Sequence, residues 1–427
     1  MNKIYLRKGE EKRFLSGHPW VFSNELMDVP KVVTTGDLVA LYSFHRKPLA
    51  VGFYNPKSLI AFRKLANLPL IGIEESAIDK NIEIENEGSL EIIFEVNLAF
   101  FETRIRKAQK LRELLYPSIE TNAYRLVYSE SDELPGLIID RFGSALSVQI
   151  FSIGMEKHID LICEALIKIF SPKLLVIRNE SVLRELEGLE TYKKMIVGSE
   201  SEAEKGVEIF DSDLRFVIDL WNGHKTGFFL DQRENRKRIR RLSKGKNVID
   251  VFTSDGGFAL HAAKAGASQV LALDSSETAL ARIKTNAKLN GFTNIMTEKA
   301  DAFERLEAMV AEGKSYDLVI LDPPSLAKSK KNLSAAQQAY RKLNRLGLQL
   351  TKPGGVIATA SCSHHLSETL FYEMLEKAIT DFNSTVRVKK HVRILETASQ
   401  APDHPIHPIM PETKYLKFAI LSVEDAS

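Results

Sequence analysis

The sequence contains only two cysteines among 427 residues, too few for a disulfide framework or, unaided, for a zinc site. It also has no run that approaches the roughly 18 uncharged apolar residues needed to cross a membrane. The first residues, MNKIYLRKGEEKR, lack the apolar core of a secretory signal. These absences predict a cytoplasmic protein that does not bind membranes, and they leave each cysteine to be explained by itself.

The sequence carries almost no excess charge of either sign, with a formal net charge of +2, so composition alone does not indicate a nucleic-acid partner. One local exception is the segment 233–246, which holds eight basic residues and one acid. Such a run is either a solvated helix face or, beside a catalytic pocket, a contact for phosphates. Lys328, Lys330 and Lys331 form a second small basic group.

The composition, 44% hydrophobic and 27% charged residues, is that of a soluble globular protein, and the length favours two or three domains. There is no internal repeat and no low-complexity tract. Residues 1 to about 70 show short strands between turns, as in a small β-barrel. The aromatic pair Trp20 and Phe22 follows several basic residues there. This mixture suits phosphate contact and base stacking, although a barrel core uses the same aromatics.

Residues from about 80 to 200 predict a small α+β domain. A helix is expected over 97–116, then a strand over 145–151, a helix over 155–170 and a strand over 174–178. Cys163 lies on the apolar side of its helix, so we expect it to be buried and structural. A strand pair over 207–222 and a helix that starts at Asp231, with Asp231 as its cap, follow.

Between Asn247 and Cys362, apolar runs alternate with segments of helical period, which is typical of a parallel sheet wrapped by crossover helices. The five runs are 248–252, 270–274, 294–297, 316–322 and 355–360. In such a sheet, ligands bind outside the carboxyl ends of the strands. We therefore expect one pocket to be lined by the loops 253–258, 274–276, 300–302, 322–325 and 361–363.

Glycines and acids at these strand ends indicate an adenosyl ligand. The pair Gly256 and Gly257 lets a ligand approach the backbone, but the loop is not GxGxxG, which weighs against a nicotinamide oxidoreductase. Asp274 ends the second strand, where it can accept hydrogen bonds from ribose hydroxyls, and Asp301 ends the third, where it can face an adenine amine. The structural alternative is that Ser275 and Asp301 only cap helices.

The last two strand ends carry groups suited to chemistry on a planar ring. Asp322 is followed by Pro323 and Pro324, which fix the backbone beside the carboxylate, although ordinary turn prolines look similar. Cys362 is an unpaired thiol at the same edge, where backbone amides and nearby bases favour a thiolate nucleophile. The two histidines that follow it, at 364 and 365, either tune the thiol or are exposed turn residues.

Together with the segments 17–22 (GHPWVF), 134–141 (LPGLIIDR) and 223–233 (GHKTGFFLDQR), the DPP and SCS motifs resemble a known family. It is the family of 23S ribosomal RNA cytosine-5 methyltransferases of the large-subunit methyltransferase I type, which begin with a PUA domain. The resemblance spans nearly the whole chain. It implies an α/β fold with a Rossmann-like class I methyltransferase domain over 201–427, preceded by a PUA-like, RNA-binding β-barrel over 1–72 and a central α+β domain over 73–200.

The resemblance also implies roles for individual residues. The catalytic pair would be Cys362, which adds to carbon 6 of the cytosine, and Asp322, which interacts with N3. The cofactor would be S-adenosylmethionine, held by Lys225, Thr226, Gly227, Leu230, Asp231, Gln232, Phe252, Thr253, Ser254, Gly256, Gly257, Asp274, Ser275, Asp301, Ala302, Asp322 and Pro323. Contacts to the 23S ribosomal RNA would come from Arg233, Arg236, Lys328 and Trp20. No metal is expected, and the oligomeric state stays open, with a homodimer as one of the states.

Ser254 and Asp255 depart from the family pattern, which usually has an aromatic residue and threonine before the glycine pair. The added carboxylate would either repel the carboxylate of the cofactor or bind its ammonium group. Two alternative functions therefore stay open. One is an RNA amine methyltransferase that uses the DPPS motif without a thiol, and the other is a non-catalytic RNA-binding factor in ribosome assembly.

Overall fold

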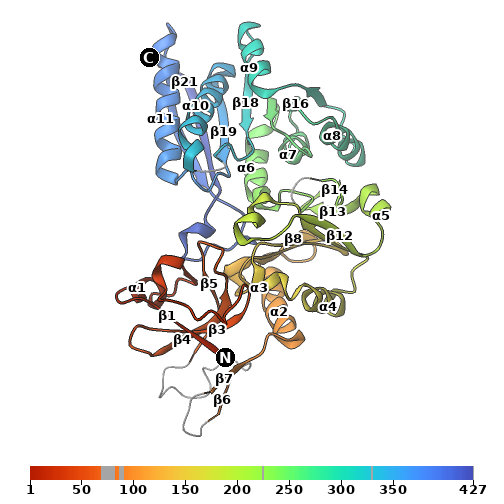
Figure 1. The fold of residues 1–427 in the computed structure, drawn as a ribbon. Coiled ribbons are helices and arrows are strands. Elements are labelled where there is room, and N and C mark those ends of the chain that lie inside the picture. Colours follow the sequence, from red (N-terminus) through yellow and green to blue (C-terminus); the bar gives the residue numbers. More distant parts are fainter. Residues whose placement is uncertain (69–81, 86–90, 224–225, 328–329, 427) are drawn as a thin grey trace. The chain divides into compact units, whose positions relative to one another are not determined.

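The computed structural model describes residues 1–68, 82–85, 91–223, 226–327 and 330–426 (Figure 1). Its contacts group the chain into two compact units. The first unit comprises Met1–Val207, Asp219–Gly227 and Pro405–Thr413, and the second comprises Glu208–Ile218, Phe228–His404 and Lys414–Ser427. In the part of the chain that is described, no helix is long and apolar enough to cross a membrane.

The first unit begins with a five-stranded sheet in the order β1-β3-β4-β5-β2. Its strands are β1 (Asn2–Tyr5), β2 (Trp20–Val21), β3 (Leu38–Tyr42), β4 (Pro48–Tyr54) and β5 (Phe62–Asn67), and a short helix, α1 (Glu11–Leu15), follows β1. Gly52 is required where β4 pairs with β5, because a Cβ at this position would meet the carbonyl oxygen of Arg63 at 2.2 Å. These elements confirm the short strands between turns that the sequence predicts for residues 1 to about 70.

The same unit contains a second five-stranded sheet, in the order β12-β11-β10-β9-β8. Its elements are α2 (Leu98–Leu115), β8 (Ala123–Tyr128), β9 (Leu137–Phe142), β10 (Ala145–Ile150), α3 (Ile153–Glu156), α4 (Ile159–Phe170), β11 (Leu174–Asn179), β12 (Tyr192–Val197) and α5 (Glu200–Lys205), with a hairpin of β6 (Ile82–Glu85) and β7 (Glu91–Phe94) before α2. The helix predicted over 155–170 is in fact two helices. The chain breaks at Lys157 and His158, where the Nδ1 atom of His158 contacts the carbonyl oxygen of Gly154 at 2.7 Å.

Cys163 is buried in α4, as predicted, and burial raises the pKa of its thiol to about 12. The boundary expected between residues 72 and 73 lies outside the described residues. The boundary expected between 200 and 201 falls at the first residues of α5. The division into three domains therefore stays a prediction.

The second unit is built on a seven-stranded sheet in the order β17-β16-β15-β18-β19-β21-β20. Its strands are β15 (Asn247–Val251), β16 (Gln269–Asp274), β17 (Ile295–Lys299), β18 (Tyr316–Leu321), β19 (Thr351–Ser361), β20 (Lys390–Ala398) and β21 (Lys417–Asp425). The first five are parallel neighbours, as the sequence predicted, while β21 runs antiparallel to both β19 and β20. The strand order reverses at β15, which makes the edge between β15 and β18 the expected ligand site.

Helices cover both faces of this sheet (Figure 1). Helices α9 (Ala302–Ala311), α10 (Leu333–Leu350) and α11 (Glu368–Thr385) pack on the face that carries Ile249, Leu271 and Val319. Helix α7 (Gly257–Lys264) contacts β15 and β16, and α8 (Glu277–Leu289) contacts β16. Helix α6 (Arg233–Ser243) and the pair β13 (Val207–Asp211) and β14 (Leu214–Ile218) come before the sheet in sequence. The carboxyl ends of β15 to β19 thus share one edge, with buried strands behind them.

Candidate active site

The loop that joins β15 to α7 is strained at the point where the strand order reverses. Phe252 has φ +62° and Ser254 has φ +49°, a left-handed conformation that L-residues rarely adopt, and Gly256 has φ +80°. The strain is held by two hydrogen bonds, from Thr253 Oγ1 to Asp250 at 2.6 Å and from the Ser254 amide to Asp274 at 2.9 Å. Backbone strain of this kind persists where the surroundings fix it, often beside a ligand.

The acid that ends β16 is held by two backbone amides. Asp274 accepts a hydrogen bond from Ser254 through Oδ2 and one from Ser276 through Oδ1, each at 2.9 Å. Ser276, not the predicted Ser275, is the N-cap of α8. Asp301 caps α9 by accepting from the amides of residues 303 and 304 through Oδ1 alone, and Ala302 is buried in the first turn of that helix.

Asp255, which departs from the family pattern, does not face the site as an uncompensated charge. It is buried, and its carboxylate lies 2.5 Å from the Nε atom of Arg282 in α8. Because the ion pair is formed within the protein, the charge of Asp255 is largely cancelled before any ligand binds. The repulsion expected between Asp255 and the carboxylate of the cofactor is therefore weakened by Arg282, which lies 27 residues further along the chain.

Asp250 lies beneath the strained loop with no exposed surface, and burial raises the pKa of its carboxyl to about 7, helped by the charges of Asp322 and Asp274. The folded-state pKa thus exceeds the unfolded value of about 3.9. Its contribution to stability is then fully present below pH 4 and is lost as the pH rises toward 7.

We expect the Asp250→Asn variant to lack this loss, because an amide keeps one oxygen for Thr253 and Ala259 but does not ionise. Its free energy of unfolding, relative to the wild type, should rise by about 2–4 kcal/mol between pH 4 and pH 8. Urea unfolding of both proteins at these two pH values measures the difference. Parallel pH profiles would show that Asp250 does not ionise in this range.

The segment before α6 supplies partners to the strand ends. Gln232 donates a hydrogen bond from Nε2 to Asp322 at 2.9 Å and accepts one from Asn235 at 2.6 Å. The prediction that Asp231 caps a helix is wrong: α6 begins at Arg233, after a 3-10 turn, because the carboxylate of Asp231 instead accepts a hydrogen bond from the Tyr415 hydroxyl at 2.5 Å. Leu230 is buried beside them, and Pro323 is buried after Asp322.

The loops that follow β18 and β19 are tied together by hydroxyl groups. Ser363 lies 3.0 Å from both the Ser325 hydroxyl and the Tyr340 hydroxyl, and Ser361 donates to Tyr340 at 3.0 Å. These bonds connect the loop of Asp322 with the loop of Cys362, a half-buried thiol. The structure therefore brings the two predicted catalytic residues to neighbouring strand ends. Sequence reasoning missed Tyr340, since an isolated tyrosine in a helix carries no pattern, whereas both of its serine partners lie in the predicted pocket loop 361–363.

A second residue that sequence reasoning missed is Lys417, the first residue of β21. It pairs with Ser361 across the sheet and is only 5% exposed. Its ammonium group donates to the carbonyl oxygens of Ser363 at 2.7 Å and Tyr415 at 2.8 Å. Burial lowers the pKa of Lys417 to about 8, and the nearby Cys362 opposes this shift. A lysine next to the apolar run 418–421 was the available signal.

Several arginines of the basic segment 233–246 form ion pairs with acids of the second unit. Arg233 and Arg236, predicted to contact RNA, are 0% and 2% exposed and surround the buried Asp211, whose carboxylate lies 3.1 Å from Arg233 and 3.4 Å from Arg236. Side chains without exposed surface cannot reach a phosphate, so this part of the prediction is corrected. Arg238 and Arg241 pair with Glu396.

Three further predicted site residues, Trp20, Thr226 and Gly227, lie in the first unit. Thr226 and Gly227 belong to the first unit, where the Thr226 hydroxyl donates to Asp140 at 2.5 Å. Trp20 donates from its indole to Glu130 at 2.7 Å and lies against the guanidinium of Arg63. Lys225 and Lys328 lie outside the described residues, so their predicted contacts stay predictions.

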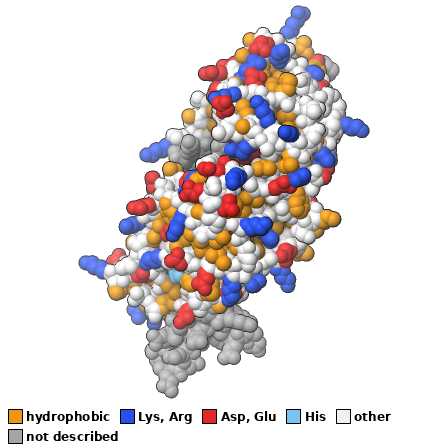
Figure 2. Space-filling model, turned by 90° about the vertical axis from the view of Figure 1, so that its right-hand side faces the viewer, with side chains coloured by type: hydrophobic (Ala, Val, Ile, Leu, Met, Phe, Trp, Pro, Cys, Tyr) orange, Lys and Arg blue, Asp and Glu red, His pale blue; other side chains and the backbone are white. Residues whose placement is uncertain are grey.

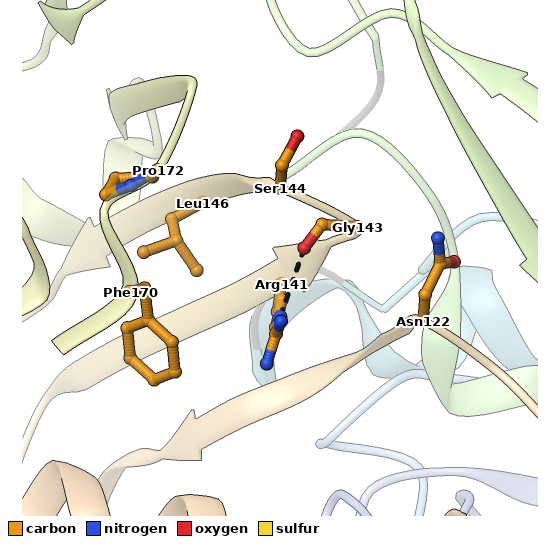
Figure 3. Close-up of a pocket in the computed structure, with 7 residues that line it drawn as sticks. All are labelled: Asn122, Arg141, Gly143, Ser144, Leu146, Phe170 and Pro172. Atoms are coloured by element: carbon orange, nitrogen blue, oxygen red, sulfur yellow. Dashed lines mark hydrogen bonds between the residues drawn. The ribbon is translucent and has the colours of Figure 1, made fainter. Parts of the chain in front are cut away.

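The surface does not separate the charges by sign on the face drawn in Figure 2, where lysine and arginine are interspersed with aspartate and glutamate. One cavity, of about 340 Å³, lies in the first unit. Figure 3 shows Arg141 in this cavity, donating to the carbonyl oxygen of Gly143, with Phe170 beside it. None of the predicted site residues lines it.

The edge of the seven-stranded sheet has features that fit an adenosyl cofactor with a positively charged sulfonium. The charges of Asp274 and Asp322 both raise the pKa of Asp250, so the three acids lie near one another, and such a group favours a cation. The buried hydroxyl of Ser254 has no hydrogen-bond partner among the described residues. A buried hydroxyl without a partner is costly and is satisfied by a polar ligand.

Comparisons with known proteins agree with this geometry. A family model of S-adenosylmethionine-dependent methyltransferases matches residues 195–403, and a model of PUA-like domains matches residues 4–67. The chain is 36% identical to the Ribosomal RNA large subunit methyltransferase I of Aeromonas hydrophila, over 97% of each chain. Among solved structures, its fold resembles that of a SAM-dependent methyltransferase from Streptococcus mutans (TM-score 0.77, 20% identity) over 99% of this chain and all of that one. A methyltransferase complexed with S-adenosylhomocysteine matches with the same coverage and identity and a TM-score of 0.79.

These matches confirm the predicted fold class, a PUA-like barrel followed by a Rossmann-like methyltransferase domain, and the predicted cofactor, S-adenosylmethionine. They leave the position that is methylated and the catalytic role of the thiol to be tested. Because its identity to a curated relative exceeds one third over nearly the full length of both proteins, the chain belongs to the family of the Ribosomal RNA large subunit methyltransferase I proteins and is an S-adenosylmethionine-dependent methyltransferase.

Proposed function

We propose that this protein methylates carbon 5 of a cytosine in 23S ribosomal RNA through a covalent adduct with Cys362. The observation that carries the proposal is that a half-buried thiol and the carboxylate of Asp322 follow neighbouring parallel strands, β19 and β18, and that Ser325 and Ser363 join their loops. The name of the Aeromonas relative supports ribosomal RNA of the large subunit as the substrate.

The chemistry needs both residues because carbon 5 of cytosine is too weak a nucleophile to accept a methyl group unaided. The Cys362 thiolate would form a bond to carbon 6, and the electron pair of the 5,6 double bond would move onto carbon 5. Asp322, oriented by Gln232, would hydrogen-bond N3 and stabilise the charge that develops on the ring. The bound cofactor supplies the methyl group. A base then removes the proton on carbon 5, and the carbon–sulfur bond breaks to release the enzyme.

The cofactor would be held by the strained loop and by the acids at the strand ends. In this proposal Asp274 contacts the ribose hydroxyls, Asp301 the adenine amine, and Phe252, Ser254 and the glycine pair the rest of the cofactor. The rigid backbone of the loop limits the entropy lost on binding. Leu230, Asp231 and Gln232, which precede α6, would contact the cofactor beside Asp322.

The RNA would have to present the target base outside a helix, since a stacked cytosine cannot reach a thiol and a methyl donor at once. We propose that the PUA-like residues 1–72 bind RNA, with Trp20 at that surface, and that residues 73–200 form a central domain between them and the methyltransferase domain, 201–427. A cytoplasmic location and a homodimer belong to the same proposal.

The test is to incubate the protein with isotopically labelled S-adenosylmethionine and 23S ribosomal RNA from cells that lack it, and to analyse the nucleosides by mass spectrometry. We expect label in 5-methylcytidine. Label in N4-methylcytidine would instead support an amine methyltransferase that uses Asp322 and Ser325. Tight RNA binding with no transferred label would support a non-catalytic assembly factor.

A further inference from the structure

A buried ammonium group lies beside the proposed nucleophile without a carboxylate partner. Lys417 is 5% exposed, and its Nζ atom donates only to two backbone carbonyls, those of Ser363 and Tyr415. Among the described residues no carboxylate lies within ion-pair distance of it. A buried charge without a counter-ion is unfavourable, so an anion near this site is expected.

The fold places this ammonium group against the loop that carries the thiol. Lys417 is paired with Ser361 in the register of β19 and β21, so its side chain starts one residue away from Cys362 along the neighbouring strand. Its hydrogen bond to the carbonyl of Ser363 anchors it on the other side of the cysteine. The lysine therefore reaches from the residue before the nucleophile to the residue after it.

The other charged and titratable groups around this pair are few. On α11, Glu368 is half exposed and already pairs with Lys414 at 2.6 Å. On α10, Tyr340 has its pKa raised by burial, while its bonds to the serines oppose the shift. His364 stacks on Tyr415. Burial has the largest effect on the pKa of Lys417, and it lowers that pKa. Among the groups that raise the pKa, Cys362 has the largest effect.

We propose that Lys417 is a positioning residue whose ammonium group stabilises the thiolate of Cys362 and so keeps the nucleophile in its reactive form at neutral pH. The interaction is reciprocal, because the thiolate that the ammonium favours is also the counter-ion that the buried ammonium needs. This inference rests on the proposed function, in which Cys362 attacks carbon 6. It assigns to Lys417 no contact with the substrate.

The experiment measures the rate of alkylation of Cys362 by iodoacetamide against pH, read by peptide mass spectrometry on the full chain. Cys163 is an internal reference, because it is buried and should not react. In the wild type, the midpoint of the profile should lie below the value of about 8.5 found for an unperturbed cysteine. In Lys417→Met the midpoint should move up by about one pH unit, with alkylation about tenfold slower at pH 7.

Two further variants sharpen the result. Lys417→Arg keeps the charge and should keep most of the wild-type rate. Lys352→Met removes a half-buried lysine at the other end of β19, where it pairs with Asp317, and should leave the profile unchanged. A folded Lys417→Met protein with the wild-type profile would overturn the proposal. If that variant does not fold, a wild-type midpoint at or above 8.5 overturns it without any variant.

Failure of this inference can be distinguished from failure of the proposed function. Alkylation reports the thiol alone, whereas methyl transfer by Cys362→Ala reports whether the thiol is needed. An alkylation shift in Lys417→Met together with undiminished transfer by Cys362→Ala would keep the electrostatic pair and reject the nucleophile. If the alkylation midpoint of Lys417→Met equals that of the wild type while Cys362→Ala no longer transfers methyl groups, Cys362 is the nucleophile and the electrostatic pair with Lys417 is rejected.

Discussion

Replacing Cys362 by alanine should reduce methyl transfer to cytosine by at least about three orders of magnitude, since removing a nucleophile removes the covalent route altogether. Cofactor binding should stay within about twofold of the wild type, because the cofactor residues proposed here belong to the loops after β15 to β18 and to the segment before α6. A Cys362→Ala protein that has lost methyl transfer but still binds the cofactor would show that the thiol acts in the chemical step.

The measurement is single-turnover transfer of labelled methyl groups to 23S ribosomal RNA, with calorimetry for cofactor binding. Cys163→Ala is the matched control, since it removes the other cysteine from the core of the first unit and should transfer at the wild-type rate. RNA that contains 5-fluorocytosine should form a denaturation-resistant adduct with the wild type and with the control only. Undiminished transfer by Cys362→Ala would reject the cytosine-5 mechanism.

The second large effect is on stability. Replacing Arg233 by methionine should lower the free energy of unfolding by about 3–5 kcal/mol, the usual cost of removing one member of a buried ion pair. Arg233 is fully buried, and it lies 3.1 Å from Asp211 and 3.5 Å from Asp403, both of which are also buried. Loss of the guanidinium would leave these two carboxylates with less compensation in a medium that solvates them poorly.

Arg241→Met is the control on the same helix, because its side chain is 66% exposed and its pair with Glu396 should be worth less than about 1 kcal/mol. Although burial raises it, the pKa of Asp211 is held below its ordinary value by Arg233 and Arg236. The stability that this gives is fully present above the unfolded value of about 3.9 and is lost as the pH falls through the lower folded value. The deficit of Arg233→Met should therefore stay constant between pH 7 and pH 5 and shrink below about pH 4. A deficit that stays constant in acid as well would point to lost packing instead.

The methyltransferase fold was predictable because its signals are local in sequence. Runs such as 316–322 and 355–360 are apolar, short and separated by segments of helical period, and this pattern leaves few alternatives to a parallel sheet. The same alternation locates the strand ends, so the amino-acid sequence alone is enough to assign Asp274, Asp322 and Cys362 to one edge of the sheet.

The partners of charged side chains were not predictable, because they come from distant parts of the chain. Nothing near Arg233 in sequence shows that Asp211 and Asp403 will enclose it, so the segment 233–246, with its eight basic residues, is predicted from the sequence to contact phosphates. The same limit applies to Asp255, whose arginine lies in the following helix, and to Lys417, whose strand is inserted antiparallel between β19 and β20.

Asp403 and His404 illustrate this limit at the end of the chain. The sequence of this segment, Asp403 and His404 before Pro405, is compatible with either a turn or an edge of the substrate pocket. Both side chains are buried, and the imidazole of His404 lies 2.8 Å from the carboxylate of Asp403. They complete the charge cluster around Arg233, so their variants should be tested first for folding and only then for activity.

The way the chain is divided between its two units has a consequence for genetic dissection. It passes from one unit to the other at 207/208, 218/219, 227/228, 404/405 and 413/414, so neither unit is encoded by one continuous stretch. A fragment cut after residue 207 would lack two pieces of the first unit, and one starting at 228 would lack β14 while keeping a stray loop at 405–413. A unit therefore cannot be exchanged as one continuous piece of the gene. A chimera must replace all three stretches that form a unit.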